Sequence, residues 1–159
     1  MKLLILSDSH GCIETMEEAI RKERPDMVVH LGDYWADGEL LQKYAIPVYQ
    51  VVGNCDRYRT APGQTETICC NIEGVPFFMT HGHHYGVKMG LERLYYGALE
   101  AGAEVALFGH THDAYCCEEG DLLLMNPGSC GSFSGTYGVI EVSNGEIQSA
   151  AIHDFTDRR

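Results

Sequence analysis

The first third of the chain alternates between short apolar runs and amphipathic stretches, and this alternation restricts the fold more than any other feature. The predicted order is strand, helix, strand, short helix, strand, at residues 2–6, 13–24, 27–31, 38–44 and 47–52. The apolar residues of 13–24 recur at helical spacing, and Pro25 ends that helix. Such an alternation predicts a parallel sheet with right-handed crossover connections.

The rest of the chain has a different pattern. Strands are predicted at 65–72 and 75–80, joined by a turn at Glu73-Gly74. A helical pattern over 85–101 and a buried strand over 104–108 come next. The remainder is predicted as antiparallel strands with hairpin turns at Glu119-Gly120 and Asn144-Gly145. With 159 residues and no linker, repeat or low-complexity tract, we expect a single domain over residues 1–159.

Polar residues that can bind metals follow five of the predicted strands. The dipeptides at these strand ends are Ser7-Asp8, Gly32-Asp33, Gly53-Asn54, Thr80-His81 and Gly109-His110. In α/β sheets, ligands bind outside the carboxyl ends of the strands. We therefore expect these side chains to gather at one edge of the sheets.

Each motif has an ordinary structural explanation when it is taken alone. Asp33 suits a helix N-cap, Asn54 suits a turn, and a lone histidine is often a hydrogen-bonded core residue. The joint occurrence of Asp8-x-His10, His81-x-His83 and His110-x-His112 at strand ends is much harder to explain in that way. Oxygen and nitrogen donors without a required thiolate favour Mn²⁺, Fe²⁺, Ni²⁺ or Zn²⁺ over Ca²⁺.

In this order, the motifs resemble the signature of the calcineurin-like metallophosphoesterases: D-x-H, G-D, G-N-x-[DE], H and G-H-x-H. The match runs from Asp8 to His112, and no ligand position is missing. Three further segments resemble the small bacterial and archaeal phosphodiesterase branch, namely Gly53-Asn54-Cys55-Asp56, Thr80-His81-Gly82-His83 and Asn126-Pro127-Gly128-Ser129. The resemblance implies a four-layer α/β/β/α sandwich of two mixed sheets flanked by helices, whereas the sequence pattern alone supports only an α/β fold with a mixed sheet pair.

The resemblance also implies a site for two divalent transition-metal ions, with Mn²⁺ as the first choice and Fe, Ni or Zn as alternatives. One ion would be held by Asp8, His10, Asp33 and His112. The other would be held by Asp33, Asn54, His81 and His110, with Asp33 bridging. Two-metal sites of this kind hydrolyse phosphate esters through a metal-bridging hydroxide, so the expected function is hydrolysis of small phosphodiesters.

Other residues near these motifs have expected supporting roles. Asp56 is expected to orient a metal ligand. Many members of the wider family have a proton-donating His where this chain has Cys55, so the leaving-group acid stays open, with His83 as a candidate. Arg57 and Arg59 are candidate contacts for the substrate phosphate.

Two alternative functions remain open on the same fold. One is a phosphomonoesterase, although a dianionic monoester would demand additional cationic contacts. The other is a non-catalytic scaffold for protein binding, as in the retromer scaffold subunit, which resembles this family but has lost part of the ligand set. The complete ligand set here favours an enzyme.

Charge and composition restrict the partners. The formal net charge of -12 disfavours long nucleic acids and anionic membranes, but it allows a small phosphorylated substrate. No apolar run is long enough for a membrane span or a signal peptide, so we expect a cytoplasmic protein; a homo-oligomer stays open. The seven cysteines include no CxxC, and we expect most of them to be small buried residues rather than disulfides.

Overall fold

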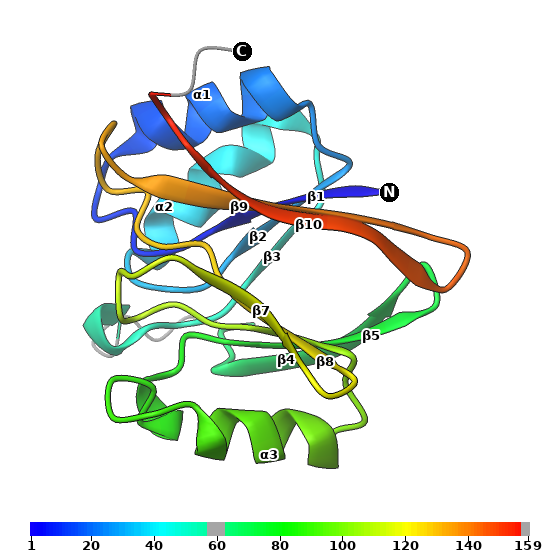
Figure 1. Cartoon of the computed structure of the whole chain (residues 1–159). Coiled ribbons are helices and arrows are strands. Elements are labelled where there is room, and N and C mark those ends of the chain that lie inside the picture. The colour runs from blue at the N-terminus through cyan, green and yellow to red at the C-terminus, as the bar shows by residue number, and fades with distance from the viewer. Residues whose placement is uncertain (57–62, 157–159) are drawn as a thin grey trace.

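Two five-stranded sheets face each other across the middle of the molecule, and helices cover their outer faces (Figure 1). This computed structural model describes residues 1–56 and 63–156. The arrangement confirms the four-layer α/β/β/α sandwich implied by the resemblance.

The first sheet contains the amino-terminal strands and the last two strands of the chain. Its order is β10-β9-β1-β2-β3. Its strands are β1 (Lys2–Leu6), β2 (Met27–His30), β3 (Val48–Gln50), β9 (Thr136–Ser143) and β10 (Glu146–Asp154). β1, β2 and β3 are parallel, as the alternation predicts, whereas β9 is antiparallel to both β1 and β10.

The second sheet is built from the middle of the chain. Its order is β4-β5-β6-β8-β7. Its strands are β4 (Thr67–Ile72), β5 (Val75–Thr80), β6 (Val105–Leu107), β7 (Tyr115–Glu119) and β8 (Leu122–Asn126). β5, β6 and β8 are parallel, and the edge strands β4 and β7 are antiparallel to their neighbours.

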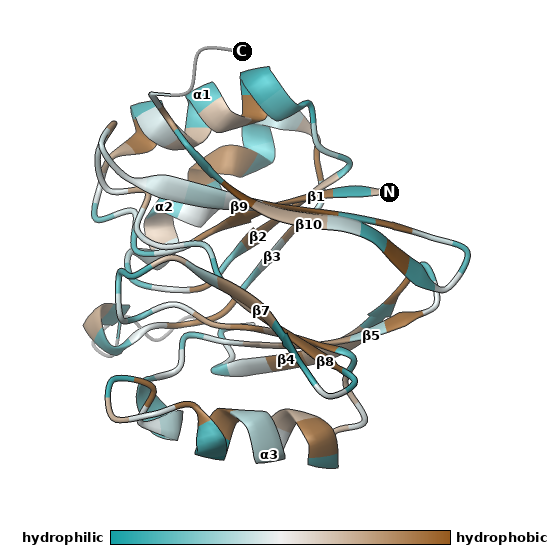
Figure 2. Ribbon diagram, viewed as in Figure 1, coloured by the Kyte–Doolittle hydropathy of each residue, from teal (hydrophilic) through white to brown (hydrophobic). Residues whose placement is uncertain are grey.

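Three layers of apolar side chains separate the four layers of backbone, and Figure 2 shows the apolar residues concentrated along the central strands. Leu3 and Ile5 of β1 lie in the core between the sheets. Leu4 and Leu6 of the same strand pack on Met16 of helix α1 (Ile13–Glu23), because successive residues of a strand face opposite sides. On the other side, Leu94 and Ala98 of α3 (Glu92–Glu100) pack on the second sheet.

Short helices connect the strands near the sheet edge that carries the polar motifs. They are α2 (Trp35–Leu40), η1 (Leu41–Tyr44), η2 (Asn54–Asp56) and η3 (His83–Tyr85). None of the helices in the described part of the chain is both long and apolar enough to cross a membrane.

Two expectations about local structure were wrong. The helix predicted over 85–101 is limited to α3, because Gly86 and Gly90 have positive φ angles of 61° and 151° and interrupt it. Most cysteines are also not buried: all seven are free, Cys130 is buried, and Cys69, Cys116 and Cys117 are exposed on the edge strands β4 and β7. Apolar neighbours in the sequence did not reveal that these strands lie at the edges.

The remaining differences concern element ends. The predicted strands 27–31, 47–52, 65–72 and 104–108 are shorter in the structure, and one hairpin turn lies at Gly120-Asp121 rather than at Glu119-Gly120. The turns at Glu73-Gly74 and Asn144-Gly145 are confirmed.

Candidate metal centre

Seven candidate ligands lie just beyond the carboxyl ends of parallel strands from both sheets. Asp8 and His10 follow β1, Asp33 follows β2, Asn54 follows β3, His81 follows β5, and His110 and His112 follow β6. The two sheets therefore contribute to one site.

Asp8 lies in the middle of this group and is completely buried. Its Oδ2 accepts hydrogen bonds from Ser7 Oγ at 2.6 Å and from the backbone N–H of His110 at 3.1 Å. Its Oδ1 has no hydrogen-bond partner, yet it lies 3.2 Å from His112 Nε2 and 3.9 Å from His10 Nε2. A buried carboxylate oxygen without a donor is costly unless a cation neutralises it.

Asp33 presents its two oxygens to different histidines. Oδ1 lies 3.5 Å from His81 Nε2, and Oδ2 lies 4.0 Å from His10 Nε2. Burial raises the pKa of Asp33, but His81 and the backbone N–H of Cys55, which donates to Oδ1 at 2.9 Å, outweigh burial and hold that pKa below its usual value. This geometry suits a carboxylate shared between two cations.

His81 shows why a cation fits here better than a network of hydrogen bonds alone. Its Nδ1 lies 2.7 Å from the carbonyl oxygen of Leu31, which can only accept, so Nδ1 carries the proton. In the neutral ring, Nε2 is then an acceptor, and it faces another acceptor, Asn54 Oδ1, at 3.0 Å. A metal ion between the two would relieve this contact, and a ligating histidine commonly donates its other N–H to a backbone carbonyl.

His10 and His112 form a second pair of facing donor atoms, after His81 and Asn54. His10 Nε2 and His112 Nε2 are 3.4 Å apart, and both lie near the free oxygen of Asp8. Asp8, His10 and His112 form one group of donor atoms within 4.8 Å of one another, and Asp8, Asp33 and His81 form another. The residues therefore fit two cations that lie close together.

His110 and His83 complete the histidine cluster. The His110 ring lies 5.0 Å from that of His81, and burial together with His81 and Lys88 lowers its pKa. The His83 ring lies 5.4 Å from that of His81, and its Nδ1 is buried without a hydrogen-bond partner. Burial and the neighbouring His84, His81 and His110 lower the pKa of His83 to about 4.

The backbone is unusual at most of these positions. Positive φ angles of 46° to 71° occur at five of the candidate ligands, namely Asp8, His10, Asp33, His110 and His112. Residues other than glycine rarely adopt this conformation, and such strain accumulates at functional sites.

Glycines allow the loops to approach closely. A Cβ atom at Gly53 would overlap the Asp33 carboxylate, and a Cβ atom at Gly109 would overlap Ser7 Oγ. The glycine that precedes the ligand in both Gly53-Asn54 and Gly109-His110 is therefore needed for this packing.

Asp56 was predicted to orient a metal ligand. It hydrogen-bonds to the backbone next to two of the candidate ligands, Asp33 and Asn54. It is buried, and its carboxylate accepts four backbone N–H groups, those of Asp33 at 3.0 Å and of Tyr34, Trp35 and Gly53 at 2.9 Å each. Two of these donors lie at the amino terminus of α2, where unpaired N–H groups favour a carboxylate. The loops of Asp33 and Asn54 are thus tied to one side chain.

A second buried carboxylate has a similar role that the sequence reasoning missed. Asp37 Oδ2 accepts hydrogen bonds from Ser9 Oγ and from the backbone N–H of Gly11, both at 2.7 Å. Ser9 Oγ also lies 2.9 Å from His30 Nε2. These contacts brace the loop that carries Asp8 and His10.

The Asn126-Pro127-Gly128-Ser129 segment braces the same loop and the loop after β6. Asn126 Nδ2 donates to the carbonyl oxygen of Gly109 at 3.0 Å and to Thr111 Oγ1 at 2.9 Å. Ser129 Oγ donates to the carbonyl oxygen of Asp8 at 2.8 Å. The sequence singled out this segment, but its contacts lie far from it in the chain.

Two predicted substrate contacts cannot be placed, because Arg57 and Arg59 lie outside the described residues.

Tyr85 packs edge-on against Phe78, with ring centroids 5.7 Å apart. His84 forms an exposed pair with Glu66 at 2.9 Å.

Comparisons with known proteins identify the family of the chain. The sequence profile of the calcineurin-like phosphoesterase superfamily domain matches residues 1–145. The chain is 36% identical over 133 residues to the probable metallophosphoesterase YsnB of Bacillus subtilis. The aligned segment covers 81% of this chain and 75% of the relative. The chain is also 29% identical over 175 residues to the phosphodiesterase MJ0936 of Methanocaldococcus jannaschii. This alignment covers 96% of this chain and 99% of the relative.

A solved structure has the same fold. It is a predicted phosphoesterase from Streptococcus pneumoniae, with a TM-score of 0.77 and 25% identity over 97% of this chain and 89% of the other. The family profile, the curated relatives and the fold agree, and the chain belongs to the calcineurin-like phosphoesterase superfamily.

Proposed function

We propose that this protein is a metal-dependent phosphodiesterase that hydrolyses small phosphodiesters at a two-metal site. The observation that carries the proposal is the convergence of histidine nitrogens on Oδ1 of Asp8, a buried carboxylate oxygen without a hydrogen-bond partner. Such a cluster is unfavourable by itself and becomes favourable when divalent cations bind.

The ligands divide into two sets that share Asp33. Asp8, His10, Asp33 and His112 would hold one ion, and Asp33, Asn54, His81 and His110 would hold the other. Two divalent ions held there would supply an activated water and neutralise charge on the phosphoryl group. Mn²⁺ is our first choice, and Fe, Ni and Zn suit the same donors.

The chain's own residues would keep this site in place before substrate arrives. Asp56 holds the loops of Asp33 and Asn54, and the carbonyl oxygen of Leu31 fixes the tautomer of His81 so that Nε2 faces the centre. Ser7 holds Oδ2 of Asp8, which leaves Oδ1 free. Preorganised ligands of this kind lose little free energy when metal and substrate bind.

The charge of the chain favours a small, weakly charged substrate. A net charge of -12 repels long polyanions, and a diester carries one negative charge where a monoester carries two. Lys88 is exposed and acts on His110 electrostatically, so it adds one cation near the centre.

The test is hydrolysis of bis-p-nitrophenyl phosphate by chelator-stripped protein with and without Mn²⁺, beside an Asp33→Asn variant. We expect metal-dependent turnover that falls in Asp33→Asn by more than the roughly 10–100-fold typical of losing an outer-shell partner. Asp26→Asn, which changes an exposed carboxylate, should keep full activity.

Other outcomes would redirect the function. Faster turnover of p-nitrophenyl phosphate than of the diester would indicate a monoesterase. Bound metal without turnover of either substrate, across Mn²⁺, Ni²⁺, Fe²⁺ and Zn²⁺, would count against the proposal and favour a scaffold or a very selective enzyme.

A further inference from the structure

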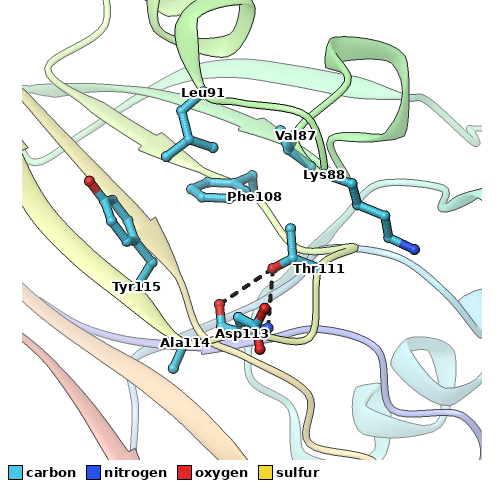
Figure 3. Close-up of a pocket in the computed structure, with 8 residues that line it drawn as sticks. All are labelled: Val87, Lys88, Leu91, Phe108, Thr111, Asp113, Ala114 and Tyr115. Carbon is cyan, nitrogen blue, oxygen red and sulfur yellow. Dashed lines mark hydrogen bonds between the residues drawn. The ribbon is translucent and has the colours of Figure 1, made fainter.

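A groove of about 450 Å³ is lined in part by the loop that carries His110 and His112 (Figure 3). One wall is the irregular segment before α3, and the other is the chain from the end of β6 to the start of β7. Its lining residues are Val87, Lys88, Leu91, Phe108, Thr111, Asp113, Ala114 and Tyr115. The volume falls within the roughly 300–1,000 Å³ typical of small-molecule sites.

The groove and the metal centre share a loop. Thr111 lines the groove and stands between His110 and His112, and consecutive Cα atoms lie only about 3.8 Å apart. A tight turn, in which the N–H of Thr111 donates to the carbonyl oxygen of Gly109 at 2.8 Å, shapes this loop. A molecule bound to metal at His110 and His112 would therefore have the groove next to it.

The interior of the groove is apolar and partly aromatic. Leu91, Phe108 and Tyr115 surround the open space, and Ala114 lies at its lower edge in the view of Figure 3. The rings of Phe108 and Tyr115 are 6.4 Å apart, and the Tyr115 hydroxyl is already used in a hydrogen bond to Glu119 at 2.9 Å. Phe108 is buried at the base of the groove, and the half-buried Leu91 and Tyr115 and the exposed Ala114 are the apolar side chains open to an occupant.

The rim of the groove carries one positively charged residue, Lys88, and one negatively charged residue, Asp113. Lys88 forms no ion pair with any residue in the described ranges, and it acts electrostatically on His110. Thr111 Oγ1 is occupied, because it accepts hydrogen bonds from Asn126 and from the backbone of Asp113. The exposed carboxylate of Asp113 would repel a second anionic group.

We propose that this groove holds a planar, uncharged aromatic arm of the phosphodiester while the phosphoryl group lies at the metal centre. The inference rests on the proposed function and deepens it, because it names the substrate class as aryl or nucleoside phosphodiesters. An aromatic ring matches the apolar walls, and the phosphoryl charge matches Lys88 and the metals.

The occupant is a part of the substrate rather than a separate ligand. The groove is lined by Thr111 of the ligand loop, so the proposal places a group in it within a few bonds of a metal-bound phosphoryl group. A lone aromatic molecule would gain only the apolar contacts, whereas a linked arm gains them without a second loss of translational freedom.

The test compares two ligands that share a phosphonate and cannot be hydrolysed at a P–O ester bond. Benzylphosphonate and methylphosphonate are titrated calorimetrically into Mn²⁺-loaded protein. Burial of the ring should make benzylphosphonate bind on the order of tenfold or more tightly than methylphosphonate.

Variants then assign the difference to the groove. Ala114→Phe fills the groove and should bring the ratio of the two affinities close to one, with methylphosphonate binding unchanged. Ala114→Leu, which fills less of it, should give an intermediate ratio. Lys88→Gln should weaken both ligands alike and keep the ratio, and Ala151→Phe, on the exposed face of β10, should change neither.

The same preparations are assayed with bis-p-nitrophenyl phosphate, so that the two proposals can fail separately. Hydrolysis without a preference for benzylphosphonate overturns the groove assignment and leaves the phosphodiesterase standing. A preference lost in Ala114→Phe, without any hydrolysis, supports the groove and refutes the proposed function. Equal binding of both ligands, binding of neither, or a preference that Ala114→Phe does not reduce overturns the groove assignment.

Discussion

The Asp56→Asn substitution tests whether one buried carboxylate holds two ligand loops together. Oδ1 of Asp56 accepts the N–H groups of Tyr34 and Trp35, and Oδ2 accepts those of Asp33 and Gly53. The asparagine amide would keep one acceptor oxygen and turn an NH₂ group toward the other two N–H groups. Two N–H donors, either the buried pair of Asp33 and Gly53 or the partly buried pair of Tyr34 and Trp35, would then lose their partner.

The magnitude follows from those two contacts. A hydrogen bond to a charged group contributes about 1.5–3 kcal/mol, so we expect the free energy of unfolding to fall by about 3–6 kcal/mol. For a domain of this size the melting temperature should fall by roughly 6–24 °C. Mn²⁺ affinity should fall by roughly 10–100-fold, because Asp33 and Asn54 lose their common support.

Urea unfolding followed by circular dichroism, in chelator, measures the stability without metal. Calorimetry of the same variant measures the Mn²⁺ affinity. The matched control is Asp26→Asn, whose carboxylate accepts a single exposed N–H, that of Lys2 at 2.7 Å, and which should lose only about 0.5–1.5 kcal/mol.

A loss of stability in Asp56→Asn no larger than in Asp26→Asn would refute the reasoning. A large loss of stability with unchanged Mn²⁺ affinity would show that Asp56 supports the fold without positioning the ligands.

Three further predictions follow from other contacts. Gly109→Ala should lower Mn²⁺ affinity in calorimetry, because the new Cβ would overlap Ser7 Oγ; Gly145→Ala, which meets nothing within 4 Å, should leave that affinity unchanged. Burial raises the pKa of Glu23, but its ion pair with Lys2 at 2.7 Å and other hydrogen bonds outweigh burial and hold the pKa below its ordinary value of 4.5. The stabilisation is therefore present above pH 4.5 and is lost as the pH falls through the lowered pKa, and urea unfolding at acid pH should show a shallower decline in Glu23→Gln. Mn²⁺ at about 100 times its dissociation constant should stabilise the protein by about 2.7 kcal/mol and raise its melting temperature by roughly 5–11 °C in thermal unfolding; no shift would contradict a site that the folded state alone provides.

Much of the architecture could be predicted from local sequence pattern. The strands before Asp8, Asp33 and His110 are short apolar runs that end in a polar residue, and the structure has strands there. The parallel arrangement of β1, β2 and β3 followed from the helices between them. The four layers came from the family resemblance, since periodicity does not say how two sheets stack.

The predictions about local structure failed where the sequence pattern of one segment disagrees with its place in the tertiary structure. The segment before α3 has helical spacing, yet positive φ angles at Gly86 and Gly90 take it out of the helix, and it forms a wall of the groove instead. Cys116 and Cys117 lie in an apolar stretch, yet they are exposed because β7 is an edge strand. Position within a sheet depends on pairing between distant segments, which the residues of one strand do not encode.

The sequence determined the donor atoms of the candidate site, because each ligand lies within a few residues of a strand end and the spacing of D-x-H, G-N and H-x-H is local. Only the tertiary structure decided how these donors meet. The carbonyl oxygen of Leu31 orients His81, and His110 donates its backbone N–H to Asp8. Asp56 accepts the backbone N–H of Asp33, which joins the loop after β2 to the loop after β3. These contacts, the unpaired oxygen of Asp8 and the apolar groove join residues far apart in the chain, so they arise only when the two sheets pack with their ligand-bearing edges together.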